Sequence, residues 1–463
     1  MVEHAQHGAG LLLSRPLSPG PGLPVVVRFA HGPEAVPRES LRDLDGRGWP
    51  DLPAPANAEP LSPWQIGASR WLEALRLGTV AHADSDLFTV GREEEVAQLE
   101  TDLEQTLKAG GACRVFCGAY GVGKSHLLEI LARRAEARGL AVSRVVLDRQ
   151  RVAACRPRRL YREIVEGLVL PGQARRGVAV LEKVLDQAAG RLMKGDLPWE
   201  QHPYFSPLLA VWAEASAASR AELLYWIGGG ERTANRRLRA RLRREVGRDP
   251  GAFYAIKDHR TVWNQLTSLV SGLACLIRDS GLAAGLTLIL DEAEMCAVES
   301  ASDQRYGDRT LTGLAAAALG PRRVRRPELL AELGGHSAVR DFPSFHRSRC
   351  HLYLALGMAT RTTGREVLER LLSKDCFVDL RPLGPTDKAG LLERILMSYK
   401  QAFPHFELST RFAIPLAGLL ELRGGGGFTP REIVQQGLAF LDGARLWPGS
   451  VESFIEECFT GDG

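Results

Sequence analysis

The chain lacks any run of apolar residues long enough to cross a membrane, since no stretch approaches the roughly eighteen consecutive apolar residues that such a helix needs. Its first residues, MVEHAQHGAG, have neither a basic start nor an apolar segment, so we expect no signal peptide. The eight cysteines are scattered without a C-x-x-C pair, and the eleven histidines do not cluster with them in a zinc-binding spacing. These absences argue against a membrane protein, a disulfide framework and a zinc domain, and they favour the reducing cytoplasm.

A strong excess of one charge is also missing. The net charge of +4 is too small for the whole chain to indicate nucleic-acid binding, so only local clusters bear on that question. Eight arginines lie in RTANRRLRARLRREVGR, Arg232–Arg248, where Leu238, Leu242 and Val246 recur with helical spacing. Such a helix can neutralise DNA phosphates, or it can be a solvated face that pairs with acidic neighbours. A second basic cluster is Arg322–Arg326, and neither cluster contains aromatic residues for base stacking.

Proline content and hydrophobic periodicity divide the chain into four parts. Residues 1–47 contain short strand-like runs separated by turns, and residues 48–62 form a proline-rich linker. Residues 63–380 alternate strand and helix patterns, with a helical insertion at about 150–285, and therefore predict an α/β layer fold. Residues 381–463 carry helical patterns without strands, which predicts a C-terminal helical lid.

Five short apolar runs in the α/β part predict the strands of one parallel sheet, buried on both faces. They are Arg114–Cys117, Val142–Leu147, Thr287–Leu290, Leu352–Leu356 and Phe377–Leu380. The first run leads directly into a glycine-rich loop and a helical pattern, which is the order that a phosphate-binding loop requires.

That loop is GAYGVGKS, Gly118–Ser125, and it fits the pattern G-x-x-x-x-G-K-[ST] in full. Gly121 and Gly123 permit backbone angles that turn successive N–H groups toward one anion, and a helix starting near Lys124 adds its N-terminal dipole. Lys124 is expected to reach the outer phosphates, and the Ser125 hydroxyl to bind Mg²⁺. The residues expected around the nucleotide here are Gly118, Gly121, Val122, Gly123, Lys124, Ser125 and His126. The alternative is a tight strand-to-helix turn with an incidental lysine.

An acidic segment, LTLILDEAE from Leu286 to Glu294, is typical of a buried strand that ends in carboxylates. Asp291 falls at the carboxyl end of this strand, where ligands bind in open α/β sheets, and is expected to hold Mg²⁺. Glu292 is expected to orient or deprotonate the attacking water. The alternative is a strand followed by the acidic first turn of a helix.

Two further positions are candidates for contact with the terminal phosphate. Thr360 ends HLYLALGMAT, a buried strand followed by small and polar residues, and it is alternatively a plain strand end. Thr429, Pro430 and Glu432 form the signature of a capped helix start, which places Arg431 in a first helical turn. A cation there opposes the helix dipole, and a nearby phosphate ligand would explain its choice; a solvent-facing arginine is the alternative.

Together these segments resemble the AAA+ ATPases, a family of P-loop proteins. The resemblance implies that Gly118–Ser125 is the Walker A loop and that Leu288–Glu292 is the Walker B segment. It also implies that Thr360 and Arg431 occupy the two sensor positions, with ATP and Mg²⁺ as cofactors. An arginine finger that reaches a neighbouring subunit's ATP is implied as well, and Arg365 and Arg370 are weak candidates for it.

The segment LFTVGREEEVAQLETDL resembles the entry of the initiator-like AAA+ branch of the Orc/Cdc6 type, which implies that Val90 and Gly91 lie beside the adenine. The phrases EALRLGTV, DLFTVGRE, GAYGVGKSHLL, RPRRLYREIVEGL, LILDEAE and FTPREIVQQGLAFLD resemble the ATP-binding proteins of BREX phage-defence systems, the BrxD type, over roughly residues 64–445. Residues 1–47 resemble the small Tudor or SH3-like barrels that dock onto proteins and sometimes onto DNA.

The function expected from these features is that of a cytoplasmic AAA+ ATPase in a multi-protein defence system. It would assemble with itself or with partner proteins and couple hydrolysis to remodelling or sensing of DNA-bound complexes. The alternative is a nucleotide-gated binding or scaffold module with little turnover unless a partner or DNA is present. A translocating helicase is less favoured, because no further helicase motif follows the DEAE segment.

Overall fold

The structure is a computed structural model, and its chain divides into two compact units. The core unit comprises Glu94–Ala119 and Lys124–Leu380, and the lid unit comprises Met1–Glu93, Tyr120–Gly123 and Arg381–Gly463. The structure describes residues 2–4, 8–12, 24–29, 32–37, 41–42, 62–77, 85–197, 201–231, 235–297, 300–331, 342–360, 363–406, 418 and 428–446.

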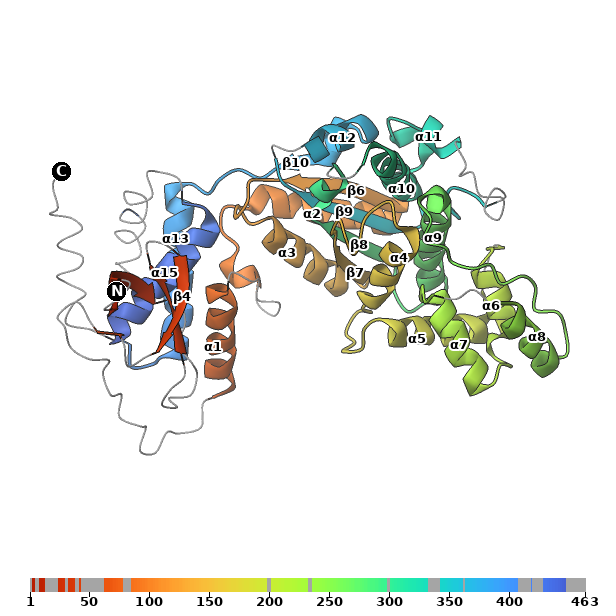
Figure 1. Cartoon of the computed structure of the whole chain (residues 1–463), viewed down its shortest axis with the longest axis horizontal. Coiled ribbons are helices and arrows are strands. Elements are labelled where there is room, and N and C mark those ends of the chain that lie inside the picture. Colours follow the sequence, from red (N-terminus) through yellow and green to blue (C-terminus); the bar gives the residue numbers. More distant parts are fainter. Residues whose placement is uncertain are drawn as a thin grey trace. The chain divides into compact units, whose positions relative to one another are not determined.

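The core unit is built on a five-stranded parallel sheet, which confirms the predicted α/β class (Figure 1). Its strands are β6 (Gly111–Cys117), β7 (Ala141–Val146), β8 (Leu286–Asp291), β9 (Leu352–Met358) and β10 (Phe377–Asp379). They lie in the order β10-β6-β9-β8-β7, so β9 separates the two strands that lead into the sequence motifs. Every residue of β8 and β9 is buried, which explains why both strands are continuous apolar runs.

Helices from several parts of the chain accompany this sheet. They are α2 (Glu93–Ala109), α3 (Lys124–Ala137), α10 (Ala301–Leu319), α11 (Glu328–Ala331) and α12 (Thr363–Leu371). Helix α3 packs on β7, β8 and β9, whereas α10 packs on β6 and β9. Helix α3, which begins at Lys124 of the loop, therefore packs against β8, the strand that carries the acidic segment.

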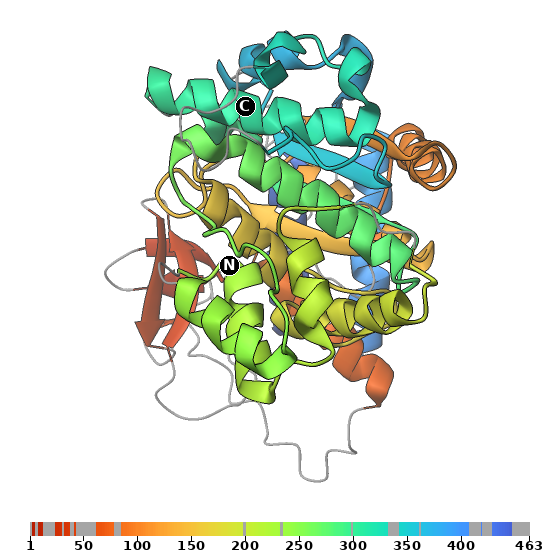
Figure 2. The ribbon, with the colours of Figure 1, turned by 90° about the vertical axis from the view of Figure 1, so that its right-hand side faces the viewer.

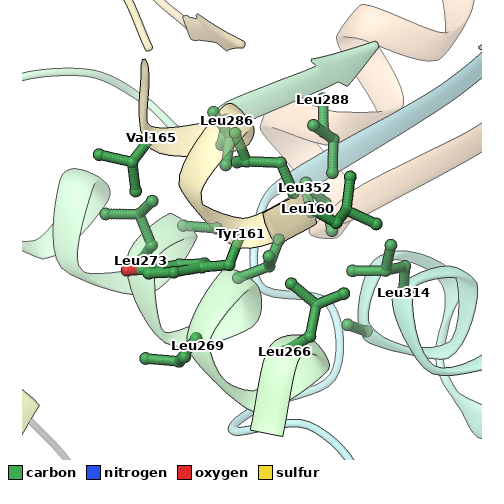
Figure 3. Close-up of a cluster of buried hydrophobic side chains, with 14 of the residues drawn as sticks. Leu160, Tyr161, Val165, Leu266, Leu269, Leu273, Leu286, Leu288, Leu314 and Leu352 are labelled. Atoms are coloured by element: carbon green, nitrogen blue, oxygen red, sulfur yellow. The ribbon is translucent and has the colours of Figure 1, made fainter. Parts of the chain in front are cut away.

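Between β7 and β8 the chain forms a series of helices, in the region where the sequence predicts an insertion. They are α4 (Pro157–Glu166), α5 (Val178–Met193), α6 (Phe205–Trp212), α7 (Ala217–Ile227), α8 (Asn235–Val246) and α9 (Trp263–Asp279). Helices α5 to α8 gather at one end of the core unit (Figure 1 and Figure 2). The first and last helices return to the sheet: Tyr161 of α4 and Leu269 and Leu273 of α9 converge with Leu286 of β8 in one buried cluster (Figure 3).

A buried histidine organises the start of α6. The Nδ1 atom of His202 accepts hydrogen bonds from the backbone N–H groups of Tyr204 and Phe205, each at 3.1 Å, and its Nε2 lies 3.1 Å from the Ser268 carbonyl oxygen on α9. Burial, together with the neighbouring His346, lowers the pKa of His202 to about 3. His202 is therefore a neutral helix cap that ties α6 to α9.

The helices of the lid unit are α1 (Pro63–Arg76), α13 (Pro385–Ala402) and α15 (Pro430–Leu446). Helix α1 packs on both of the others, and its Arg76 donates hydrogen bonds to Asp442 of α15 at 2.8 and 3.0 Å. The sequence analysis grouped residues 63–93 with the α/β core, whereas α1 packs on the lid helices, because its apolar face is covered by α13 and α15. A local hydrophobic pattern predicts a helix but does not say which unit covers it.

Five strands near the N-terminus form an antiparallel sheet in the order β4-β3-β2-β1-β5. They are β1 (Val2–His4), β2 (Gly8–Leu12), β3 (Pro24–Phe29), β4 (Gly32–Pro37) and β5 (Leu41–Arg42). The resemblance of residues 1–47 to a Tudor or SH3-like barrel stays a prediction. The predicted linker lies outside the described residues apart from its last position, and so do residues 447–463. Among the helices that the structure describes, none combines the length and apolarity of a membrane span.

Candidate nucleotide-binding site

The glycine-rich loop joins β6 to α3, in the order that the sequence predicts. Gly121 and Gly123 have φ angles of +79° and +105°, in the left-handed region that favours glycine. The Lys124 ammonium donates hydrogen bonds to the carbonyl oxygens of Gly118 at 2.9 Å and Ala119 at 3.1 Å. Lys124 thus folds back over its own loop, and it is the first residue of α3, where the helix dipole favours an anion.

The remaining predicted loop residues take different environments. Val122 is buried, and its carbonyl oxygen accepts a 2.9 Å hydrogen bond from the Arg92 guanidinium, which is itself buried. Ser125 and His126 are half-buried in the first turn of α3. The backbone N–H of Gly118 donates to the Met358 carbonyl oxygen at 3.1 Å, which anchors the start of the loop to the end of β9.

The two motifs meet at Asp291. Its Oδ2 atom accepts a 3.0 Å hydrogen bond from the Ser125 hydroxyl, although the two residues are 166 positions apart in the chain. Its Oδ1 atom accepts a 3.0 Å bond from the Glu292 backbone N–H. A Cβ atom on Gly357 of β9 would lie 2.7 Å from that Oδ1, so glycine at 357 leaves the space that Asp291 occupies. A hydroxyl and a carboxylate are oxygen ligands suited to Mg²⁺, so the residues present fit the expected ion.

Arg144 of β7 is a participant that the sequence analysis missed. Its guanidinium donates to Asp291 Oδ2 at 3.3 Å and to Glu129 Oε2 of α3 at 2.7 Å. Glu129 and Asp291 are both nearly buried, so Arg144 supplies the positive charge that two buried carboxylates need. The signal was a charged residue inside the otherwise apolar run of β7.

Glu292 follows β8 with a φ of +58°, a conformation that is uncommon for a residue other than glycine. Such backbone strain is concentrated at functional sites, where it aims a side chain. Burial, followed by the negative charges of Glu294 and Asp291, raises the pKa of the Glu292 carboxyl above its usual range. A carboxylate with a raised pKa is a stronger base than an ordinary glutamate.

Thr360 lies two residues beyond the end of β9 and is half-buried. Because β9 lies between β6 and β8, its carboxyl end faces the same edge of the sheet as the loop and Asp291. The position agrees with the expected place of a sensor residue, and the role of its hydroxyl stays a prediction.

The segment that contains Val90 and Gly91 is held by α13 within the lid unit. The Arg394 guanidinium donates to three backbone carbonyl oxygens before this segment, those of Asp86 (3.4 Å), Leu87 (3.0 Å) and Thr89 (2.9 Å). Gly91 has a φ of +61°, and a Cβ atom on it would lie 2.6 Å from the carboxylate of Asp387 on α13. Neither Arg394 nor Asp387 belongs to a motif, so the sequence carried no signal for them.

The predicted capped helix start is present at α15. The Thr429 hydroxyl accepts from the Glu432 backbone N–H at 3.3 Å, and Glu432 Oε2 accepts from the Thr429 backbone N–H at 2.8 Å. Arg431 therefore lies in the first turn, as expected. Its guanidinium donates a 2.6 Å hydrogen bond to the hydroxyl of Tyr120, a residue of the glycine-rich loop that also belongs to the lid unit.

The two arginine-finger candidates on α12, Arg365 and Arg370, differ in whether their charge is paired with acidic side chains. Arg365 is paired with Asp379 and donates to Glu369 at 2.8 Å, which satisfies its guanidinium within the core unit. Arg370 is exposed, and the described part of the chain offers it no hydrogen-bonded acidic partner. Of the two, Arg370 is the one whose guanidinium is available at the surface.

The basic helix of the sequence analysis is α8. Leu238 and Leu242 are buried, so the apolar stripe is confirmed, although Arg232 lies outside the described residues. Several arginines of this basic cluster pair with acidic neighbours: Arg239 and Arg241 of α8 with Asp249 and Glu222, and Arg248, which follows α8, with Glu214. In the second cluster Arg326 pairs with Glu328 at 2.7 Å. The positive charge of both clusters is thus partly neutralised by the protein itself.

Residues 67–206 match the family model described as "BREX system ATP-binding protein BrxC/D". The matched segment includes the glycine-rich loop and ends before β8, and within residues 67–206 it confirms the resemblance to the BREX ATP-binding proteins. The phrases LILDEAE and FTPREIVQQGLAFLD lie outside the matched segment, and their resemblance stays a prediction. A search of curated proteins found no match.

Proposed function

Starting from the match to the BREX ATP-binding proteins, we propose that this chain binds ATP with Mg²⁺ and hydrolyses it. The observation that carries the proposal is the 3.0 Å hydrogen bond between the Ser125 hydroxyl and Asp291, which joins the ends of two distant motifs. Glu292 stands next to Asp291 with an unusual backbone angle and a raised pKa, as a general base requires.

Each residue has a distinct task in this proposal. The loop N–H groups and the Lys124 ammonium bind the phosphates, while Ser125 and Asp291 would hold Mg²⁺, which would neutralise charge on the phosphate oxygens. Glu292 accepts the proton of the attacking water as that water approaches the terminal phosphorus. Val90 and Gly91 lie along the adenine, and Thr360 and Arg431 contact the terminal phosphate.

The proposal also includes assembly of the chain with itself and contact with DNA. Exposed Arg370 is suited to complete the ATP site of a neighbouring copy, whereas Arg365 is held by internal ion pairs. Exposed Arg236 and Arg237 of α8 form no ion pair with any described residue and are available to DNA phosphates. The chain would then couple ATP turnover to complexes of DNA with other proteins of the defence system.

The alternative is a nucleotide-gated scaffold with little turnover on its own. It is favoured by the internal bonds of Asp291, since Arg144 and Ser125 already satisfy the carboxylate within a single chain. Turnover would then require a partner, DNA or a second copy that shifts these contacts.

The deciding experiment is phosphate release at several protein concentrations, with and without duplex DNA. We expect turnover that rises with concentration or DNA and is lost in Glu292→Gln, while ATP binding persists in that variant. Glu104→Gln, at an exposed ion pair on α2, is the matched control and should keep its activity. Bound ATP without turnover under any of these conditions would overturn hydrolysis and favour the scaffold.

A further inference from the structure

An exposed tyrosine inside the glycine-rich loop contacts Arg431 in two ways. The side chain of Tyr120 is 73% exposed, yet its hydroxyl accepts a 2.6 Å hydrogen bond from the Arg431 guanidinium. The guanidinium carbon also lies 5.3 Å from the centroid of the Tyr120 ring, within cation–π distance. The Tyr120 side chain thus contacts the Arg431 guanidinium through its hydroxyl and through the face of its ring.

The backbone on either side supports this contact. A Cβ atom on Gly121 would lie 2.8 Å from the Thr429 hydroxyl, so the absence of a side chain at 121 permits the close approach of the start of α15. The backbone N–H of Arg431 points to the Gly121 carbonyl oxygen at 3.4 Å. The first turn of α15 therefore contacts Tyr120 and Gly121, and this places the Arg431 side chain beside the part of the loop that belongs to the lid unit.

The side chain that contacts Arg431 is neutral, and this determines whether the arginine charge stays available. Arg365 shows the usual arrangement, in which carboxylates pair with a guanidinium and use its charge. Arg431 forms no ion pair with a carboxylate among the described residues, and its recorded side-chain partner is a neutral phenol. A neutral holder fixes the direction of the guanidinium and leaves its positive charge for an anion. A free arginine would also lose more side-chain entropy on binding a phosphate.

We propose that Tyr120 is a positioning residue that holds the Arg431 guanidinium beside the phosphate loop, so that it recognises the terminal phosphate of ATP. This inference rests on the proposed nucleotide site and extends it, because neither motif assigns a role to Tyr120. Its consequence is selectivity: Tyr120 acts through Arg431 on ATP, which has a terminal phosphate to contact, and leaves ADP binding nearly unchanged.

The test is a double-mutant cycle read by nucleotide affinity. Tyr120→Ala, Arg431→Ala and the double variant are titrated with fluorescent ATP and ADP analogues. We expect each single variant to reduce the preference for ATP over ADP by about fivefold or more, and the double variant to lose no more than Arg431→Ala. Tyr120→Phe keeps the ring face but not the hydroxyl, so it should fall between wild type and Tyr120→Ala. Tyr225→Ala, at another exposed tyrosine, should match wild type.

The outcomes separate this inference from the proposed function. Additive effects of the two substitutions, or equal losses for ATP and ADP, would overturn the positioning role even if wild-type turnover is normal. If the effects of the two substitutions are coupled, but the wild-type protein binds ATP without turning it over, the positioning role would be supported and hydrolysis would be overturned. Because Tyr120 is exposed, its variants are expected to unfold at the wild-type temperature, which circular dichroism checks.

Discussion

The core unit and the lid unit hold their candidate site residues in different ways. In the core unit, Ser125 and Asp291 are placed by helix α3 and strand β8, and the surrounding strands are buried throughout. In the lid unit, the segment at Val90 and the side chain of Arg431 are placed by a few polar contacts from Arg394 and Tyr120. The candidate phosphate and metal ligands of the core unit are thus placed by buried elements of a sheet, whereas the candidate residues of the lid unit depend on individual side chains.

The largest effect is expected in the core unit, at Asp291, the proposed metal ligand. Asp291→Asn removes the charge that would hold Mg²⁺ and leaves the Arg144 guanidinium without one of its two carboxylates. Turnover should fall by at least about a hundredfold in phosphate-release assays. Asp303→Asn is the matched control, because Asp303 also pairs with an arginine but lies on α10 away from the motifs. An equal loss of turnover in the two variants would mean that Asp291 has no special role in the proposed site.

The second prediction concerns stability of the core unit. His202→Ala removes the acceptor of two backbone N–H groups and leaves a cavity, which should cost about 2–4 kcal/mol in urea unfolding. The pKa of His202 is about 3 in the folded chain against an ordinary 6.5, so between these values only the unfolded chain takes up the proton. The free energy of unfolding should therefore fall as the pH drops from 6.5 toward 3, and less steeply in the variant. His259→Ala, at an exposed histidine, should leave the wild-type slope unchanged.

The matching change in the lid unit should act on affinity instead. Arg394→Ala removes donors from three backbone carbonyl oxygens that precede Val90, at an exposed side chain. We expect ATP affinity to fall by roughly tenfold with little change in melting temperature. Lys400→Ala, later on the same helix, is the control for general effects on α13. A large loss of stability with unchanged affinity would mean that the lid unit is as rigidly built as the core unit.

The smallest effect is a shift in pH dependence. Glu292 works as a base when deprotonated, so turnover should be lost as the pH falls through its pKa, which burial and then Glu294 raise. Glu294→Gln removes a neighbouring negative charge and should move this acid limb to lower pH, by less than about one unit. An acid limb that stays in place or moves upward would show that Glu294 does not act on the catalytic carboxylate.

The sequence predicted those elements of both units whose signals are local. Five apolar runs, two glycines with left-handed angles and the capping box at Thr429 each depend on residues close together in the chain. Arg144, Arg394 and Tyr120 were missed because their importance arises from contacts between distant segments. Arg144 alone left a trace, as a charge in an apolar strand. The packing of α1 on the lid helices was not predicted for the same reason.

The ion pair between Arg144 and Asp291 also affects how Asp291 would bind a metal ion. A buried carboxylate normally needs a cation, and here the protein carries that cation in its own sheet. The single charge of Arg144 is shared between two buried carboxylates, those of Asp291 and Glu129. If the proposed site takes up Mg²⁺, the ion would compete with this guanidinium for Asp291, and a cation that arrives together with a triphosphate would have the advantage over a cation alone.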